Sequence, residues 1–405
     1  MLNDILKENG FRIRISEEER RNYPAEVFFL EEAFLRHYYP IAGLPPAHLG
    51  ELLAAAARIA ADPEKRETAW CLYRIFLGDD AATIRSFPLR MTVPGDDTPL
   101  LYLLLLMALI PACEERAGRE GFPLRYAHAA ATRIGIAAKL YAKGHGGGFG
   151  AAPVSLPFML HFLYRPAYRI GRFDFMLEQA GGNLPIICER DGKFRLFCRD
   201  GWELNADGER AATGEPVLRT AFFREEGDEA EGIPIDPATG LAEPRSERIP
   251  LRGRTKPVEL GDWVLHFHIP GGGGMTPELC QASFREAFRF FREHYPDRPI
   301  RLIYTVSWIG NPLWAERMPD SNLAALIRSS LLFPGISSPD AGVFFVFGRN
   351  DRPYENYPRG TTLERVILDH LRDGGRLRSV GMAIPPALYE TETDLTDAPP
   401  PCILQ

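Results

Sequence analysis

The chain has 405 residues, 45% of them hydrophobic and 25% charged, which is the composition of an ordinary globular protein with room for two or three domains. Its 54 acidic residues outnumber 47 basic ones, for a net charge of −7, so no general cationic surface attracts nucleic acid. The first residues, "MLNDILKENG", do not resemble a secretory signal. We therefore expect a cytoplasmic protein without a nucleic-acid partner.

The first 150 residues have the pattern of a helical domain. Strong helix formers dominate "HLGELLAAAARIAADPEKRETAWCLYRIFLG" and "RYAHAAATRIGIAAKLYAKG". The longest apolar run, Leu100 to Ile110, has 11 residues and is too short to cross a bilayer, so we predict a buried helix and no membrane partner. The glycine-rich "GHGGGFGAAP", residues 144–153, is typical of a linker. These signals predict a helical domain over residues 1–150 and a second domain over residues 151–405.

The period of the apolar residues changes to two after this linker. The segments "FDFML", "LPIICE" and "KFRLFCRDG" are predicted strands, and the turn dipeptide Asp191-Gly192 joins the last two. Residues 205–260 are polar and contain several prolines and glycines. We predict that they form mostly loop, with a few short strands.

The strongest strand and helix signals begin at Trp263. "WVLHFHI" alternates as a strand does, Thr276 is a good N-cap and Pro277 suits the first position of a helix. The strand "IRLIYTVSW" follows that helix, so residues 263–308 predict a right-handed parallel crossover. Predicted helices "SNLAALIRSSLLF" and "TTLERVILDHLRDGG" then alternate with predicted strands "AGVFFVFGR" and "RSVGMAI". The fold class is therefore α+β or α/β, with a sheet domain after the helical one.

Four consecutive glycines, Gly271 to Gly274, separate the first strand of this crossover from its helix. Such a turn collects free backbone N–H groups at the positive end of a helix dipole, which suits phosphate. No Gly-Lys-Ser/Thr follows and the GxGxxG spacing fails, which excludes a P-loop kinase and a dinucleotide-binding dehydrogenase. The pattern alone leaves open whether the glycines bind phosphate or only turn the chain.

Two histidines of the strand, His266 and His268, lie on one face and are candidates for chemistry. No Asp, Glu or Cys nearby in the sequence completes a metal-ligand set, so we expect no metal. A structural role and a role in proton transfer both remain open. Ser307 ends the second strand, at the edge where open sheets bind ligands, and a structural role and a role in the site both remain open for it.

Seven landmarks in one order give the chain a resemblance to a known family. They are "YRIGRFDF", "GIPIDP", "ELGDWVLHFHIP", "MTPELCQASFREAFRFF", "VSWIGNPL", "MPDSNL" and "TTLERVILDHLRDGG". Together they cover residues 168–375 and resemble bacterial acyltransferase-like proteins, in which a helical N-acyltransferase amino-terminal domain precedes a GNAT-like carboxy-terminal domain. Residues 1–150 resemble the family only in their helical character and length.

The resemblance implies a GNAT-like mixed sheet that binds acyl-CoA or coenzyme A as co-substrate. The implied cofactor-binding residues are Ile269, Gly271, Gly272, Gly273, Gly274, Thr276 and Asn322. The usual loop, Gln/Arg-x-x-Gly-x-Gly/Ala, here begins with His268 and includes Pro270, which has no N–H to donate. Asn322 and Ala325 match a second GNAT pattern, but Ser329 stands where a tyrosine usually protonates the leaving thiolate. Asn322 is also, with Asp320 and Ser321, an N-cap candidate.

The implied function is acyl transfer from acyl-CoA to an amine of a small molecule or peptide. The strand from Trp263 would supply a backbone N–H to the oxyanion. His268, or His266 in its place, would be the base or hold a water that relays the proton, and Ser307 would lie beside them. The alternative function is that of a non-catalytic GNAT-shaped protein with a CoA-binding or regulatory role. A purely structural scaffold is a third possible function.

Overall fold

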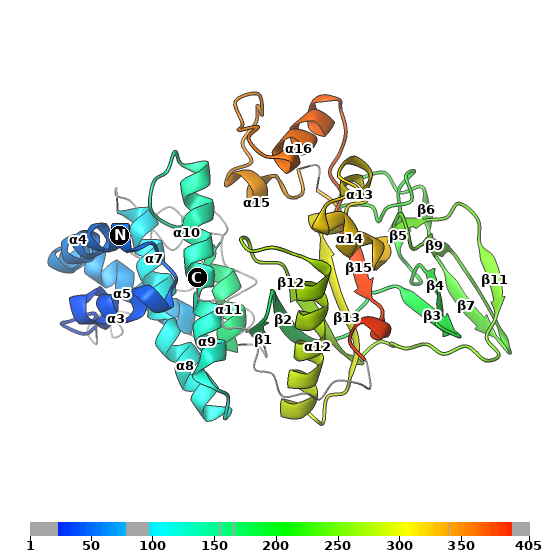
Figure 1. Ribbon diagram of the computed structural model, residues 1–405, viewed down its shortest axis with the longest axis horizontal. Coiled ribbons are helices and arrows are strands. Elements are labelled where there is room, and N and C mark those ends of the chain that lie inside the picture. Colours follow the sequence, from blue (N-terminus) through cyan, green and yellow to red (C-terminus); the bar gives the residue numbers. More distant parts are fainter. Residues whose placement is uncertain (1–22, 78–96, 154, 165–166, 339, 391–405) are drawn as a thin grey trace.

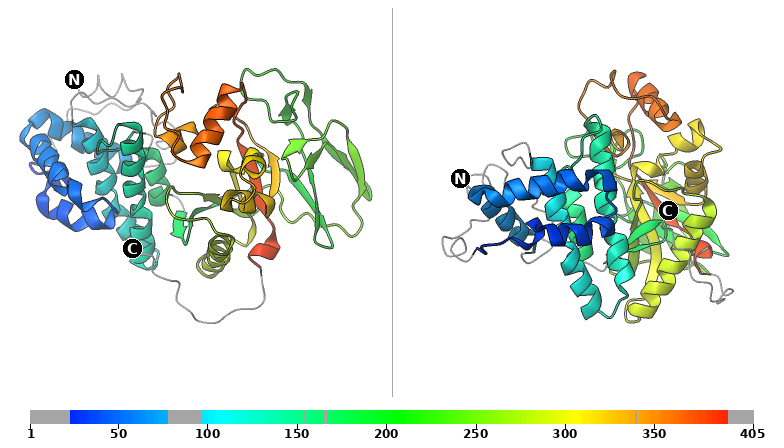
Figure 2. Two further views of the ribbon diagram at one scale, coloured as in Figure 1. Left: turned by 45° about the horizontal axis from the view of Figure 1, so that its top comes forward. Right: turned by 60° about the vertical axis from the view of Figure 1, so that its left-hand side comes forward.

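The computed structural model describes residues 23–77, 97–153, 155–164, 167–338 and 340–390. A helical half and a sheet half lie side by side, and the first sheet strands, β1 and β2, face the helices (Figure 1 and Figure 2). The helical half contains the elements η1 (Phe28–Leu30), α3 (Glu32–Ile41), η2 (Pro46–His48), α4 (Leu49–Ala61), α5 (Pro63–Leu77), α7 (Thr98–Ala108), α8 (Ile110–Arg119), α9 (Leu124–Ala131), α10 (Arg133–Gly144) and α11 (Ser155–Tyr164). The predicted helical character of this part is confirmed for the described residues.

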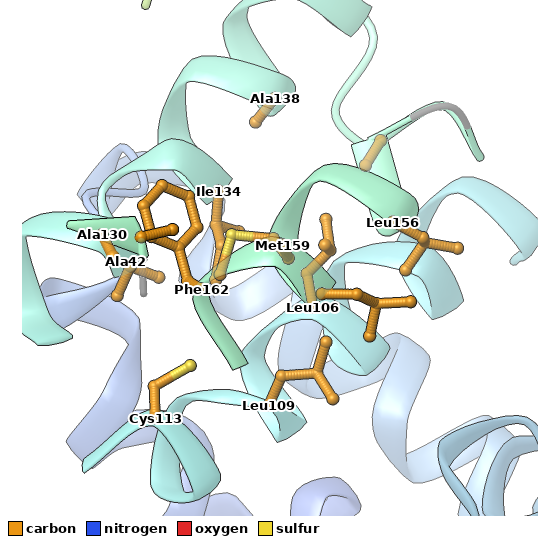
Figure 3. Packing of buried hydrophobic residues seen from close by; sticks show 14 of the residues in the cluster. Ala42, Leu106, Leu109, Cys113, Ala130, Ile134, Ala138, Leu156, Met159 and Phe162 are labelled. Atoms are coloured by element: carbon orange, nitrogen blue, oxygen red, sulfur yellow. The ribbon is translucent and has the colours of Figure 1, made fainter. Parts of the chain in front are cut away.

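The apolar run Leu100 to Ile110 forms the centre of the helical half. None of its side chains is more than 7% exposed. Side chains from α7, α8, α10 and α11 pack together there, as Figure 3 shows. The stretch Thr98–Arg119 is long and apolar enough to cross a membrane by composition, but 67% of its most apolar window is buried inside the protein, as in a core helix. The predicted buried helix is therefore confirmed.

The glycine-rich residues 144–153 do not end the helical layer. They lead into α11, which contacts α7, α8, α9 and α10 as well as strand β1. The helices therefore continue to Tyr164, and the domain boundary near residue 150 remains a prediction.

The main sheet has six strands in the order β1-β2-β12-β13-β15-β14. Strands β12 and β13 are parallel and are joined by helix α12 (Pro277–His294), whereas all other neighbours are antiparallel. The strands are β1 (Ala167–Ile170), β2 (Phe173–Gln179), β12 (Trp263–His268), β13 (Ile300–Ser307), β14 (Leu331–Pro334) and β15 (Val380–Ile384). The predicted parallel crossover and the predicted mixed sheet are confirmed.

Residues 180–262 form small sheets that cover one face of the main sheet. The predicted hairpin at Asp191-Gly192 joins β3 to β4, with positive φ at both residues (53° and 73°). Buried side chains of this region, such as Trp202 and Ile235, share a core with Val264 and Tyr304 of the main sheet. The small sheets contain β3 (Ile186–Arg190), β4 (Lys193–Phe197), β5 (Glu203–Leu204), β6 (Arg219–Thr220), β7 (Phe223–Glu226), β8 (Glu229–Gly232), β9 (Pro234–Asp236), β10 (Leu241–Ala242) and β11 (Glu247–Pro250).

Two predicted elements near the carboxyl end are wrong. The segment "AGVFFVFGR" is not a strand but contains helix α15 (Val343–Phe347), because Val343, Val346 and Phe347 are buried at helical spacing while Phe345 is exposed. The predicted helix "SNLAALIRSSLLF" ends early: α14 covers Asn322–Arg328, and its last apolar residues form edge strand β14 against β15. The other elements here are η3 (Trp308–Gly310), α13 (Leu313–Arg317), α16 (Thr362–Arg372) and η4 (Pro386–Leu388).

The helical and sheet halves share one continuous hydrophobic core. Phe290 of α12 is 3% exposed and packs against Phe122 and Tyr126 of the helical half and against Tyr168 of β1. Beside these rings Tyr168 donates a hydrogen bond to Glu120 at 2.9 Å. Apolar contacts and a polar link therefore both hold the two halves together.

Replacing Phe290 tests how much this shared core stabilises the whole chain. We expect Phe290→Ala to lower the free energy of unfolding by about 3–5 kcal/mol, because it removes a buried ring and leaves a cavity between the halves. Phe345→Ala is the matched control: its ring is 63% exposed, so the change should stay within about 0.5 kcal/mol. Urea unfolding measures both values, and similar losses in the two variants would contradict the shared core.

Candidate active site

Strands β12 and β13 pair over only part of their length. Their register runs from Trp263–Ile300 to His266–Tyr304, although β12 continues to His268 and β13 to Ser307. Beyond that point β12 pairs only with β2, and β13 only with β15. One backbone edge of each strand is therefore left without a strand partner at the carboxyl end of the parallel pair, where open sheets bind ligands.

His266 lies at this opening, next to a carboxylate of β2. Its Nδ1 atom is 3.5 Å from Oε1 of Glu178, and its ring stacks on Tyr304 with centroids 4.8 Å apart. The Tyr304 hydroxyl donates to the same Oε1, and burial, with Glu178 beside it, raises the pKa of Tyr304. Nε2 of His266 is buried and has no hydrogen-bond partner among the described residues. Glu178 and Tyr304 thus orient the imidazole, and its Nε2 makes no hydrogen bond to a described residue.

His268 lies closer to the helical half. Its ring centroid is 4.5 Å from that of His266, and Phe158 of α11 packs edge-on against it at 5.2 Å. Burial lowers the pKa of His268 well below 6.5, and His266, Arg133 and His161 lower it further. The imidazole is therefore neutral at pH 7 and a weaker base than the ordinary histidine that we expected from the sequence.

Asp174 of β2 links this pair of strands to the helical half. It is fully buried and lies directly opposite His268 across the strands. Arg133 of α10 forms an ion pair with it, and Arg169 of β1 lies 3.8 Å away on the other carboxylate oxygen. The Arg133 guanidinium also stacks over Phe158, 3.9 Å from the ring centroid. These contacts place α10 and α11 against the end of β12.

The glycine run forms an exposed loop after β12. Gly272 and Gly273 have φ of 78° and 72°, a left-handed conformation that glycine adopts without penalty. Arg172, in the turn between β1 and β2, donates from Nε to the carbonyl of Gly274 and from Nη2 to that of Pro270, both at 2.8 Å. The side chain therefore fixes both ends of the loop.

The start of α12 is as predicted. Thr276 is the N-cap, and its hydroxyl accepts a hydrogen bond from the N–H of Leu279 at 3.4 Å. Ile269, just before the loop, is half-buried against the main core. A side chain at Gly271 would bring its Cβ to 3.4 Å from Ile136 of α10, so the loop also approaches the helical half.

The remaining predicted residues form local hydrogen bonds or lie exposed in a helix turn. The Ser307 hydroxyl accepts from the N–H of Ile309 at 3.3 Å and starts η3. Ser321, not Asn322, caps α14, and Asn322 is exposed in its first turn. Ser329 ends that helix and donates to the carbonyl of Leu326 at 2.9 Å. No hydrogen bond among the described residues joins Ser307, Asn322 or Ser329 to His266 or His268.

Sequence reasoning missed Glu178, Tyr304, Arg172 and Arg133. The alternation of "FDFMLEQ" puts Asp174 and Glu178 on one face of β2, but it does not reveal that β2 pairs with β12. Over the residues that the structure describes, no group of three or more His, Cys, Asp or Glu side chains could hold a metal. The site is therefore built from histidines, a carboxylate and arginines around a loop and an unpaired strand edge.

A mixed sheet whose parallel pair opens next to a glycine loop and helix start defines a GNAT-like domain. The family model for the GNAT-like C-terminal domain matches residues 167–382, more than half of the chain, and the protein belongs to this family. No curated protein matches it by sequence.

Solved structures similar to this chain are acyltransferases. One, in complex with CoA and 10C-teicoplanin, has a TM-score of 0.61 and 19% identity over 95% of this chain and 99% of its own. Another, in complex with decanoyl-CoA, has a TM-score of 0.56 and 20% identity over 87% of each chain. A third, with decanoyl-CoA and teicoplanin, has a TM-score of 0.59 and 19% identity over 95% of this chain and 98% of its own. These likenesses extend the shared fold to the helical half.

The lowered pKa of His268 predicts how stability depends on pH. Below about pH 6.5 the unfolded chain binds a proton at this histidine that the folded chain does not, so the folded state loses stability as the pH falls. Between pH 6.5 and 5 this loss is at most about 2 kcal/mol, and His268→Asn should remove it. The exposed His37 provides the control variant His37→Asn. Urea unfolding at several pH values measures the effect; equal pH profiles for wild type and His268→Asn would contradict it.

Proposed function

We propose that the protein is an acyl-CoA-dependent N-acyltransferase that transfers an acyl group to an amine of a small molecule or peptide in the cytoplasm. The observation that carries this proposal is the unpaired end of β12, which lies between the glycine loop and the Glu178–His266 pair. Membership of the family and the CoA-bound neighbours support acyl-CoA as the co-substrate.

In this proposal acyl-CoA binds along the end of β12. The diphosphate lies on the loop Gly271 to Gly274 at the start of α12, where free N–H groups and the helix dipole favour an anion. The pantetheine arm then follows the unpaired edge of β12, and a backbone N–H of that edge donates to the thioester carbonyl. That N–H stabilises the oxyanion as the carbonyl becomes tetrahedral.

The acceptor amine must lose a proton before it attacks, and we assign this step to His266. Its Nε2 takes the proton while the Glu178 carboxylate at Nδ1 stabilises the imidazolium. The neutral amine attacks the thioester carbon, a C–N bond forms and the C–S bond breaks to release the CoA thiolate. His268, neutral and adjacent, is better suited to hold a water or the acceptor than to take the proton.

The thiolate must gain a proton to complete the reaction. The Ser329 hydroxyl already donates to the Leu326 carbonyl, and a serine hydroxyl is a weak acid compared with a phenol. In this mechanism water or the His266 imidazolium provides the proton. The arrangement at Ser329 also favours a second candidate function, a non-catalytic protein that binds CoA.

The acceptor would approach from the helical half. Phe158 and Arg133 contact His268 and its surroundings, and Ile136 lies near Gly271, so α10 and α11 border the proposed thioester site. A neighbour that binds teicoplanin supports a small-molecule or peptide acceptor.

Binding and turnover distinguish the proposal from its alternative. Calorimetry with CoA, acetyl-CoA and decanoyl-CoA should give binding, and release of free thiol in the presence of an amine library should reveal transfer. Binding without thiol release for any amine would favour the non-catalytic candidate. No binding of CoA or of either acyl-CoA would reject both functions.

His266→Ala tests the assigned base. We expect it to lower kcat about 10² to 10⁴-fold with little change in affinity for CoA, because the base acts on the acceptor and not on the nucleotide. Glu178→Gln, which keeps the shape but removes the charge, should lower kcat less and shift the pH profile. The exposed His145→Ala is the matched control. If His266→Ala keeps the wild-type rate and pH profile, the base lies elsewhere.

A further inference from the structure

Arg172 is held in place from three sides. Its backbone N–H donates to the Ser283 hydroxyl of α12 at 2.7 Å, and Nε and Nη2 donate to the carbonyls at the two ends of the glycine loop. The preceding Gly171 has φ of 55°, and a Cβ there would lie 2.4 Å from the Ser283 hydroxyl. The turn therefore fits closely against α12, and the guanidinium has a fixed position under the loop.

The third nitrogen of this guanidinium has no hydrogen-bond partner among the residues that the structure describes. Nη1 of Arg172 is buried and donates to no described residue. Arg172 also forms no ion pair within the described part of the chain. Arg169 and Arg133 lie nearby, and both already pair with Asp174. Arg133 and Arg169 thus share the one carboxylate and Arg172 pairs with none, and a partly buried cation without a counter-ion is costly unless an anion binds to it.

The loop above Arg172 presents further donors. The N–H groups of residues 271–275 donate no hydrogen bond to any described residue. Gly272 and Gly273 are both left-handed, and the 18-residue helix α12 begins three residues after Gly274. Free N–H groups in such a turn and the positive helix end both favour an anion. The segment from His266 to Thr276 contains no Lys or Arg, so the cation at this loop must come from elsewhere in the chain.

We propose that Arg172 binds the diphosphate of acyl-CoA through Nη1, together with the N–H groups of the glycine loop. The inference rests on the proposed function and names the residue that supplies the charge which the loop itself lacks. Nε and Nη2 keep the loop in its shape, and Nη1 contacts the ligand. A diphosphate fits better than a single carboxylate because the donors extend over both the loop and the arginine.

Four ligands locate the contact by removing parts of CoA one at a time. They are CoA, dephospho-CoA without the 3′-phosphate, phosphopantetheine with one phosphate, and pantetheine with none. Arg172→Gln should lower the affinity for CoA and for dephospho-CoA alike, by about 10- to 100-fold. The affinity for pantetheine should stay nearly unchanged. A loss confined to CoA would instead assign Arg172 to the 3′-phosphate and overturn the proposal.

Further variants separate ligand contact from loop support. Arg172→Lys keeps the charge but not the fork, so its affinity for CoA should be intermediate and should fall with ionic strength as steeply as that of wild type. Arg172→Gln should show a weaker dependence on ionic strength. Arg285→Gln, which removes an exposed arginine from α12, is the control and should bind as wild type does. The proposal fails if Arg172→Gln binds CoA as tightly as wild type does. It also fails if this variant loses affinity for CoA and for pantetheine by the same factor.

Inorganic pyrophosphate tests the anion site apart from the proposed function. It should raise the melting temperature of wild type and of Arg285→Gln. The increase for Arg172→Gln should be much smaller. If CoA does not bind while pyrophosphate still distinguishes these variants, the anion site stands and acyl-CoA binding is rejected. If pyrophosphate stabilises all variants equally or none, the anion site is rejected.

Discussion

The buried carboxylate of Asp174 is the interaction on which the arrangement of the site depends. It lies on β2 opposite His268 and is paired by Arg133 from the helical half and by Arg169 from β1. A buried carboxylate that loses its partners costs several kcal/mol, so α10 must stay next to this strand edge for the fold to be stable. The position of the helices relative to β12 is thus set by charge as well as by the shared core.

That constraint explains why residues from distant parts of the chain meet at the end of β12. Phe158 reaches His268 from α11, Glu178 reaches His266 from β2, and Arg172 reaches the glycine loop from the turn before β2. Each histidine therefore has a different environment: a carboxylate faces one, and arginine and aromatic groups face the other. Two identical side chains on one strand face therefore lie in different surroundings, and burial lowers the pKa of His268.

The parts of the fold that are local in sequence could be predicted, and those that depend on strand pairing could not. The β12–loop–α12 unit follows from alternation, from the Thr276 cap and from Pro277, and all of these were visible in one short segment. The helix Val343–Phe347 was mistaken for a strand because a run of consecutive apolar residues has no period, and only packing decides its conformation. Glu178 and Arg172 were missed because antiparallel pairing of β2 with β12 brings them to the site, and no local pattern encodes that register.

The core that joins α12 to the helical half limits how this protein can be divided or recombined. The family module spans residues 167–382, yet Phe290 within it is covered by Phe122 and Tyr126, which lie outside it. A module moved to another chain without these helices would expose aromatic surface that is buried here, and would tend to aggregate. Substitutions at Phe122 and Phe290 must therefore compensate each other during divergence, so the two halves are expected to evolve as a pair rather than to be exchanged between relatives.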